Sequence, residues 1–181
     1  RAKQRGWRAV GLDISSWARR RAAQRFGLDV RADLRSCTDE SFDVVTAFQV
    51  LEHMPHPASA LAEIYRCLRP GGLLVIETWD RQSWIARLFG PHWQQVTPPS
   101  VVHLFTRRSL VQLLTRQGFR AVAFHRVSKL VSLRFVASLL AQKHPRQLGF
   151  LSALAQRSWL RTLAFPYSLG DLIAVAAQKP T

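Results

Sequence analysis

Cysteine and methionine are scarce in this chain. Its 181 residues contain two cysteines, Cys37 and Cys67, and one methionine, Met54. Two cysteines give neither a disulfide framework nor the ligand spacing of a metal site, so a disulfide-stapled secreted domain is disfavoured and a reducing cytoplasm is the default location. Position 1 is arginine, and we therefore expect the sequence to be a processed chain or a fragment.

Acidic residues are almost absent from the second half. Residues 81–181 hold fourteen of the 26 Lys and Arg residues but one of the 11 Asp and Glu residues, and the formal net charge is +15. This excess favours an anionic partner or surface through long-range attraction. A solvated basic face without a partner explains the charge equally well. With 48% hydrophobic residues, the chain can bury one sizeable core, and we expect a single domain over 1–181.

The stretch 41–78 has the pattern of a strand, a helix and a strand. Residues 44–46 form a β-branched run typical of a strand buried on both faces. Apolar residues at 60–68 recur every three to four positions, which predicts a helix, and Pro70-Gly71-Gly72 is expected to stop it. A second buried strand follows at 73–78. Because the crossover has the length of a helix, the two strands are expected to be parallel.

Upstream, residues 7–12, 17–26 and 28–32 are expected to form another strand, helix and strand. An aspartate follows each strand, Asp13 after the first and Asp33 after the second. An acid at the carboxyl end of a strand is placed to accept hydrogen bonds from ribose hydroxyls, as in dinucleotide-binding folds. A helix N-cap is the alternative role for Asp13, and an ordinary turn aspartate is the alternative for Asp33.

Three short motifs, SFDVV, VLEHMPHP and LRPGGLLVIET, occur in this order within 41–78. Together they resemble the class I S-adenosylmethionine-dependent methyltransferases, and among these the small-molecule enzymes that include the ubiquinone-biosynthesis O-methyltransferases. The resemblance implies an α/β fold with a Rossmann-like, doubly wound, mostly parallel sheet of strand order 3-2-1-4-5-7-6 and an antiparallel C-terminal strand at 171–177. It also implies S-adenosylmethionine as the cofactor.

The resemblance also indicates what the sequence lacks. No Gly-x-Gly turn precedes the strand at 7–12, although such a turn cradles the amino-acid portion of the donor in the family. We therefore expect the first strand and the Gly-rich loop to be missing. Residues 1–181 alone are expected not to bind S-adenosylmethionine with micromolar affinity.

Five residues are expected to bind the cofactor on the basis of the resemblance. Asp13 matches the residue that holds the adenosyl ribose, and Ile14 stands beside it. Asp33 and the amide of Leu34 match the positions that read the adenine edge. Phe48, at the end of its strand, is expected to pack on the adenosyl group or the methyl donor. A core position is the alternative for Phe48.

Two histidines, His53 and His103, are the candidate general bases, because the unperturbed pKa of histidine lies near neutrality. Some related O-methyltransferases have a Glu-x-x-Glu-His motif that is thought to hold a divalent cation, but Gln49 replaces its first acid here. One carboxylate, Glu52, and one imidazole make a poor magnesium site, so we expect no metal. His103 precedes the helix expected at 109–117, and a structural role is its alternative.

The segments 79–105 and 129–168 are expected to form the acceptor side of the domain. The first has an aromatic, apolar patch. The second has basic amphipathic helices, expected at 129–143 and 148–165, which carry too much charge to span a bilayer. These helices either form a lid over a small or lipid-like acceptor or lie on an anionic membrane.

Three functions remain open at this point. The first is a methyltransferase acting at oxygen, nitrogen or carbon, in the cytoplasm and with or without peripheral contact with the inner face of the membrane. The second is a basic module that keeps the fold without catalysis and binds an anionic surface; nucleic acid is disfavoured as its partner. The third is an NAD-dependent enzyme, disfavoured because no Tyr-x-x-x-Lys pair is present.

Overall fold

The computed structural model describes residues 2–93, 95–127, 129–132, 164–167 and 170–181. Its helices and 3-10 helices are η1 Lys3–Arg5, α1 Ser16–Phe26, η2 Leu34–Ser36, η3 Leu51–His53, α2 Pro57–Cys67, α3 Trp84–Phe89, η4 Gly90–His92 and α4 Arg107–Arg116. Its strands are β1 Val10–Leu12, β2 Asp29–Arg31, β3 Phe42–Phe48, β4 Leu68–Trp79, β5 Arg120–Arg126, β6 Lys129–Ser132, β7 Ala164–Tyr167 and β8 Leu172–Gln178.

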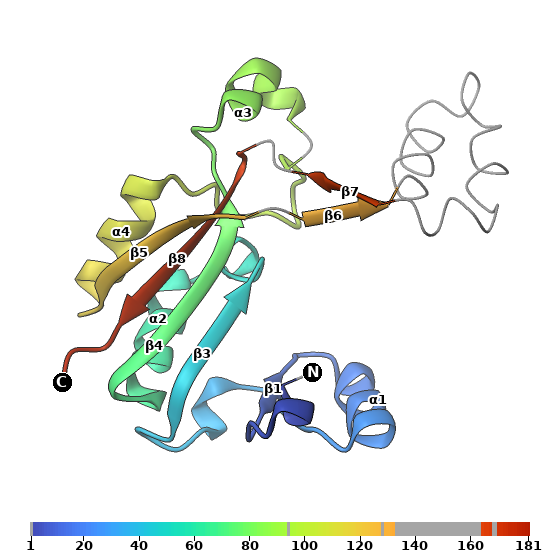
Figure 1. The fold of residues 1–181 in the computed structure, drawn as a ribbon, viewed down its shortest axis with the longest axis vertical. Helices are drawn as coiled ribbons and strands as arrows, with labels where there is room; N and C mark the ends of the chain where they lie inside the picture. Colours follow the sequence, from blue (N-terminus) through green and yellow to red (C-terminus); the bar gives the residue numbers. More distant parts are fainter. Residues whose placement is uncertain (1, 94, 128, 133–163, 168–169) are drawn as a thin grey trace, which may run out of the picture.

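Four strands form the main sheet in the order β3-β4-β8-β5. β3 and β4 are parallel, whereas β8 runs antiparallel to both of its neighbours, β4 and β5, and lies between them (Figure 1). The α/β class and the antiparallel strand near the C-terminus are thus confirmed. The order also matches the 4-5-7-6 half of the expected sheet.

β1 and β2 form a second, two-stranded sheet of parallel strands. Within the described residues they do not pair with β3, and Figure 1 shows β1 and α1 set apart on the β3 side of the main sheet. α1 connects the two strands and ends at Gly27, whose φ of 58° lies in the left-handed region that glycine adopts without strain. We refer to β1, α1 and β2 as the β1–β2 unit.

One hydrophobic core lies between the main sheet and the helices α2 and α4, which cover the same face of it (Figure 1). Alternate residues of β4 and β8 point into it, as the two-residue period of a strand requires. Its fully buried members include Leu61 of α2, Leu110 and Leu114 of α4, Leu74 and Ile76 of β4, and Ile173 and Val175 of β8.

The boundary between α2 and β4 differs from the prediction. α2 ends at Cys67 and β4 begins at the next residue, so Pro70-Gly71-Gly72 lies within the strand and does not stop the helix. The reason is that Leu68 already pairs with Phe42 of β3, and the register then shifts before the regular ladder begins. Gly72 is required in this irregular stretch, because a Cβ there would lie 2.8 Å from the carbonyl oxygen of Arg69.

Arg66 fastens α2 to the segment that follows the β1–β2 unit. Its guanidinium donates to the carbonyl oxygens of Leu34 (3.1 Å) and Cys37 (2.9 Å). It also pairs with Glu63 (2.9 Å) and with Asp39. Hydrogen bonds to Glu63 and Asp39 raise the pKa of Arg66 further above its ordinary value, so the guanidinium stays charged and keeps its donors.

The prediction of a helix at 129–143 is wrong where it can be compared with the structure. Residues 129–132 form β6, which pairs antiparallel with β7 at 164–167, so the predicted helix at 148–165 is also wrong at its last two residues. A short apolar run does not distinguish a helix from a strand, and here pairing with a distant segment decides. The rest of both predicted helices, 133–143 and 148–163, lies outside the described residues.

None of the helices within the described ranges combines the length and the apolar character that crossing a bilayer requires.

Candidate active site

The first part of the site is the turn that follows β1. The Asp13 amide donates to the carbonyl oxygen of Arg31 on β2 (3.0 Å), which places Asp13 at the carboxyl end of the small sheet. Its Oδ1 accepts from the Ser15 amide (2.8 Å), and Ser15 itself caps α1 by accepting from the Ala18 amide (3.3 Å). The N-cap alternative for Asp13 is therefore wrong. Within the described residues, Asp13 Oδ2 accepts no hydrogen bond.

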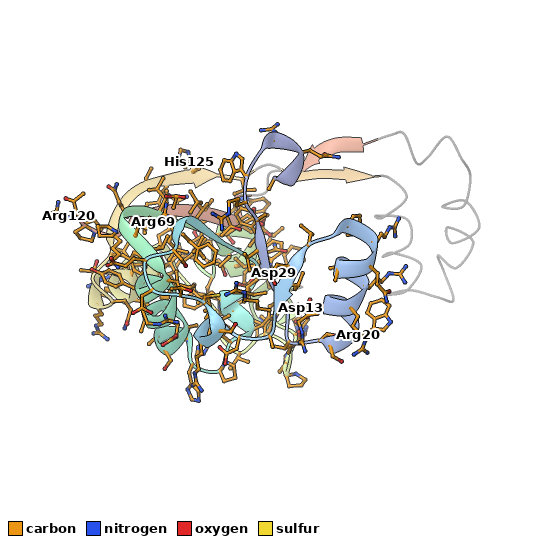
Figure 2. All side chains as sticks on the ribbon, turned by 90° about the horizontal axis from the view of Figure 1, so that it is seen from below. Asp13, Arg20, Asp29, Arg69, Arg120 and His125 are labelled. Atoms are coloured by element: carbon orange, nitrogen blue, oxygen red, sulfur yellow. The ribbon has the colours of Figure 1, made fainter. Side chains whose placement is uncertain are left out.

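The same turn is held from the helix side. Arg19 Nη1 donates to the carbonyl oxygens of Asp13 and Ile14, each at 2.8 Å. Ile14 is 92% exposed. Figure 2 shows Asp13 at this turn, with Arg20 further along α1. The turn thus presents an oriented carboxylate beside an uncovered apolar side chain, which suits the hydroxyls and the carbon face of a ribose.

The second part of the site follows β2. Asp33 Oδ1 accepts from the Arg35 amide (3.0 Å) at the start of η2, so Asp33 does act as a turn aspartate. Leu34 packs against the edge of the hydrophobic core. This pair is therefore positioned by α2 and the core as well as by β2. Its contact with an adenine ring stays a prediction.

The third part is the end of β3. Phe48 is 55% exposed and is not a core residue, so its side chain is available to pack on a ligand. Gln49 follows with a φ of 54°, a left-handed conformation that is uncommon for a residue with a side chain. Its amide donates to the carbonyl oxygen of Glu77 on β4 (2.7 Å), which fixes the turn against the neighbouring strand.

Glu52 lies at the centre of the next turn and is buried, with 1% of its surface exposed. Its Oε2 accepts from Thr78 Oγ1 of β4 (3.0 Å). Its carbonyl oxygen accepts from the amides of Val102 (2.9 Å) and His103 (3.1 Å). Sequence reasoning considered Glu52 as a metal ligand and did not single out Thr78; the available signal was a lone acid in the apolar turn VLEHM.

The structure brings the two candidate bases to one junction. His53 Nδ1 lies 2.6 Å from the carbonyl oxygen of Ser100, and His103 Nε2 lies 3.3 Å from that of Pro55. A carbonyl oxygen only accepts, so each of these ring nitrogens carries a proton. In the neutral rings, His53 Nε2 and His103 Nδ1 are then the nitrogens that can take up a proton. The role of either histidine as a general base stays a prediction.

In the described part of the chain, no three or more His, Cys, Asp and Glu side chains are grouped so that they could hold a metal ion. The expectation of a metal-free site is not tested by this observation and stays a prediction.

The segment 79–105 connects the end of β4 to α4. Asp80 is buried, and its carboxylate accepts from the Gln82 amide (2.9 Å) and lies 3.8 Å from Arg107 Nε. Trp79 and Trp93 pack edge to face, with ring centroids 6.5 Å apart. The segment is thus a folded element beside the carboxyl ends of β3 and β4, the edge where open α/β sheets bind ligands.

A family model described as a methyltransferase domain matches residues 1–123 of this chain. The chain belongs to the class I S-adenosylmethionine-dependent methyltransferases. This confirms the family that the three motifs indicated, and S-adenosylmethionine is the cofactor that membership implies.

Among the relatives of this chain is the ubiquinone biosynthesis O-methyltransferase of Alkalilimnicola ehrlichii, 28% identical over 138 residues, a match covering 64% of this chain and 56% of that enzyme. Another is the 2-methyl-6-phytyl-1,4-hydroquinone methyltransferase of Synechocystis, 34% identical over 89 residues, 45% of this chain and 28% of that enzyme. The chain thus spans little more than half the length of the first relative.

A solved structure with the same fold is the 1,6-didemethyltoxoflavin-N1-methyltransferase of Burkholderia thailandensis, with bound 1,6-didemethyltoxoflavin and S-adenosylhomocysteine. The TM-score is 0.54 and the sequence identity 21%, with 99% of this chain and 64% of that chain covered. At this identity the likeness concerns the fold.

The chemistry of the side chains at these strand ends is compatible with the adenosyl part of the cofactor. The deciding observation is the Asp13 carboxylate, which is exposed, held by the Ser15 amide and supplied with an oxygen that the described residues leave unused. A ribose presents two neighbouring hydroxyls, and an ionised carboxylate can accept from both. Phe48 is the last residue of β3, and Asp13, Ile14, Asp33 and Leu34 follow within three residues of the carboxyl end of β1 or β2.

Proposed function

We propose that this protein transfers the methyl group of S-adenosylmethionine to a small or lipid-like acceptor. The observation that carries the proposal is the Asp13 turn, which offers an oriented, exposed carboxylate where the family holds the adenosyl ribose. Family membership supports the reaction type. Asp33 and Leu34 are then the adenine contacts, and Phe48 with Ile14 packs against the adenosyl group.

When bound, S-adenosylmethionine supplies a methyl group that is already activated by its sulfonium. The protein therefore needs chiefly to align the acceptor with that methyl group and to exclude water. His53 Nε2 is the atom that we assign to take a proton from the acceptor, because Nδ1 of the same ring is engaged by Ser100. His103 is a second candidate at the same junction.

For the acceptor we propose a hydroxylated aromatic ring, with or without a lipid tail. The relatives support this choice, since one is named for ubiquinone biosynthesis and another for a phytyl hydroquinone. The acceptor is placed between the end of β3 and segment 79–105. Segment 129–168 is a further part of the acceptor side in this proposal, although most of it lies outside the described residues.

The proposal is tested by calorimetric titration of the full-length protein with S-adenosylmethionine and, separately, with NAD. We expect saturable binding of S-adenosylmethionine and no heat of binding with NAD. Transfer of radiolabelled methyl groups from the donor to a panel of phenols then distinguishes an enzyme from a module without catalysis. Binding of NAD in place of S-adenosylmethionine would contradict the proposal.

Peripheral contact with an anionic membrane is a second candidate function, favoured by the surface of α3. Trp84, Leu88 and Phe89 are 58%, 69% and 51% exposed, and the exposed Arg87 lies among them. Exposed aromatic and aliphatic side chains next to basic ones are typical of segments that lie in the membrane interface. The net charge of +15 adds attraction to anionic lipid.

Sedimentation with anionic and with neutral vesicles at low and high salt tests the membrane contact. We expect binding to anionic vesicles that weakens steeply with salt, because exposed charges are screened over about 8 Å at physiological ionic strength. Leu88→Asp should weaken it further, whereas Leu104→Asp, at another exposed leucine outside α3, should not. Equal and negligible binding to both kinds of vesicle would refute the contact.

A further inference from the structure

Two buried polar atoms at the end of β3 have no hydrogen-bond partner within the described part of the protein. They are Nε2 of Gln49 and Oε1 of Glu52. Such atoms are rare in folded proteins, because each one gives up its hydrogen bond with water on folding and gains no other in return, which costs free energy. For Glu52 the effect is larger, since its carboxylate is 1% exposed and no described cation pairs with it.

Both residues are anchored to the same corner of the main sheet. The Gln49 amide donates to the carbonyl oxygen of Glu77 (2.7 Å), and Glu52 Oε2 accepts from the hydroxyl of Thr78 (3.0 Å). Glu77 and Thr78 are successive residues near the carboxyl end of β4. The turn that carries the two unsatisfied atoms is therefore fixed at both residues to the carboxyl end of β4.

The backbone of Gln49 is a further independent observation. Its φ of 54° is a conformation that glycine adopts freely and that is strained for glutamine. A glycine at this position would relieve the strain. Residues kept in unfavourable backbone conformations and buried polar groups without partners both concentrate at functional sites, where a ligand completes the arrangement.

A hydroxyl group has both the acceptor that Gln49 Nε2 lacks and the donor that Glu52 Oε1 lacks. An oxygen of this type accepts from the amide of Gln49 and donates its hydrogen to the carboxylate of Glu52. A methoxy group in the same place could accept from Gln49, but it would leave the carboxylate without a donor.

We propose that Gln49 and Glu52 together hold a hydroxyl group of the methyl acceptor other than the one whose proton His53 takes, and thereby select rings with a free hydroxyl there over the corresponding methyl ethers. This inference rests on the proposed methyltransferase function and names two specificity-determining residues for it. Because neither atom has exposed surface, the acceptor reaches them when residues 100–103, hydrogen-bonded to Glu52 and His53, move aside. These residues belong to segment 79–105, which the proposal above places on the acceptor side.

The test measures binding of 1-naphthol and of 1-methoxynaphthalene to the full-length protein in the presence of saturating S-adenosylhomocysteine. We expect the unmodified protein to bind 1-naphthol about tenfold or more tightly than its ether, the usual scale for a hydrogen bond to a charged group. Gln49→Met and Glu52→Gln should each reduce this preference severalfold. Glu63→Gln, which changes a glutamate of α2 paired with Arg66, is the matched control and should leave it unchanged.

A thermal melt of each variant separates this role from a purely structural one. Gln49→Met removes a buried donor without a partner, so its melting temperature should equal or exceed that of the unmodified protein. A structural role predicts a lower melting temperature and an unaltered preference for 1-naphthol.

Each remaining outcome has a definite meaning. The proposal that Gln49 and Glu52 hold a hydroxyl group would be overturned by equal affinity for the two probes, by no detectable binding of 1-naphthol, or by an unaltered preference in both variants. Failure to bind S-adenosylhomocysteine would instead overturn the proposed function. The two failures are distinguishable, because donor binding is measured before either probe is added.

Discussion

The β1–β2 unit and the main sheet are stabilised in different ways. In chain order, the first buried side chain among the described residues is Cys37, so the whole β1–β2 unit is without one. Trp17 and Phe26 of α1 are 62% and 59% exposed, and Trp7, which precedes β1, is 59% exposed. The main sheet, by contrast, encloses the hydrophobic core of the described residues together with α2 and α4.

Because of this difference, we expect the stability of the protein and its binding of the methyl donor to depend on different parts of the chain. Asp13 and Asp33 belong to the part of the chain before Cys37, which has no buried side chain among its described residues. This part is fixed by local hydrogen bonds, by the packing of Leu34 on the core and by the hydrogen bond from Arg66 of α2 to Leu34. Segments that bind ligands commonly have low local stability. We therefore expect changes in the β1–β2 unit to affect donor binding, and changes in the main sheet to affect unfolding.

The largest expected effect is a difference in the free energy of unfolding between variants of two strand leucines. Leu74 of β4 is 0% exposed, and Leu12 of β1 is 45% exposed. Leu74→Ala should lower the free energy of unfolding by about 2–5 kcal/mol, because it leaves a cavity in the core. Leu12→Ala should change it by less than about 0.5 kcal/mol, as is usual for surface substitutions. Urea denaturation of residues 1–181 measures both. Equal losses would contradict the division between the two regions.

The next effect concerns donor binding. Asp13→Ala in the full-length protein should weaken S-adenosylmethionine binding by about 1.5–3 kcal/mol, the range for hydrogen bonds to a charged group, and leave unfolding almost unchanged. Calorimetry measures the affinity. The control is Asp29→Ala, an exposed aspartate at the start of β2 that pairs with Arg31 (Figure 2), and it should retain full affinity. Unchanged affinity in Asp13→Ala would remove Asp13 from the site.

The N-caps of α4 and α1 allow a matched comparison of the two regions, with a smaller expected effect on the free energy of unfolding. Thr106 caps α4 by accepting from the Ser109 amide (3.1 Å), and Ser15 caps α1 by accepting from the Ala18 amide (3.3 Å). Thr106→Ala should lower the free energy of unfolding by about 1 kcal/mol. Ser15→Ala should change it less, because α1 has no buried residue and can open locally. Hydrogen exchange should instead become faster in α1, and equal losses in urea would show that α1 unfolds with the core.

The smallest effect is a pH dependence from Cys67. Burial raises the pKa of this thiol, whose sulfur lies 3.8 Å from the carbonyl oxygen of Leu34. Above about pH 8.5 the unfolded thiol loses its proton while the folded one retains it, so stability should fall as the pH rises. The Cys67→Ala variant should show a shallower decline above about pH 8.5. An identical decline in the unmodified protein and the variant would show that Cys67 does not contribute.

Much of the fold could be predicted from the sequence wherever the pattern is local. The run at 44–46, the apolar period at 60–68 and the cap Thr106 each depend on neighbouring residues, and the structure contains β3, α2 and α4 there. Residues 129–132 could not be assigned in this way. Their strand exists because residues 164–167 pair with them, and such pairing leaves no local signal.

The candidate site likewise has residues that local sequence predicts and residues whose environment depends on distant segments. Asp13 could be located because an acid directly after a strand has a defined place at the edge of a sheet. The burial of Glu52 could not be predicted, because it depends on Thr78 and on Val102 and His103, which come from two other segments. The positive φ of Gln49 could not be predicted from the sequence either, since glycine or asparagine is the usual residue in that conformation.

The position of β8 between β4 and β5 has a consequence for synthesis. Both neighbouring strands leave the ribosome before residue 172, and until β8 arrives each has a row of backbone groups with no partner from that strand. At the usual rates of translation, the wait between the end of β5 and the end of β8 is roughly 3–10 s. During that interval the nascent chain carries two open sheet edges, which are the features that chaperones protect and that other nascent chains can pair with.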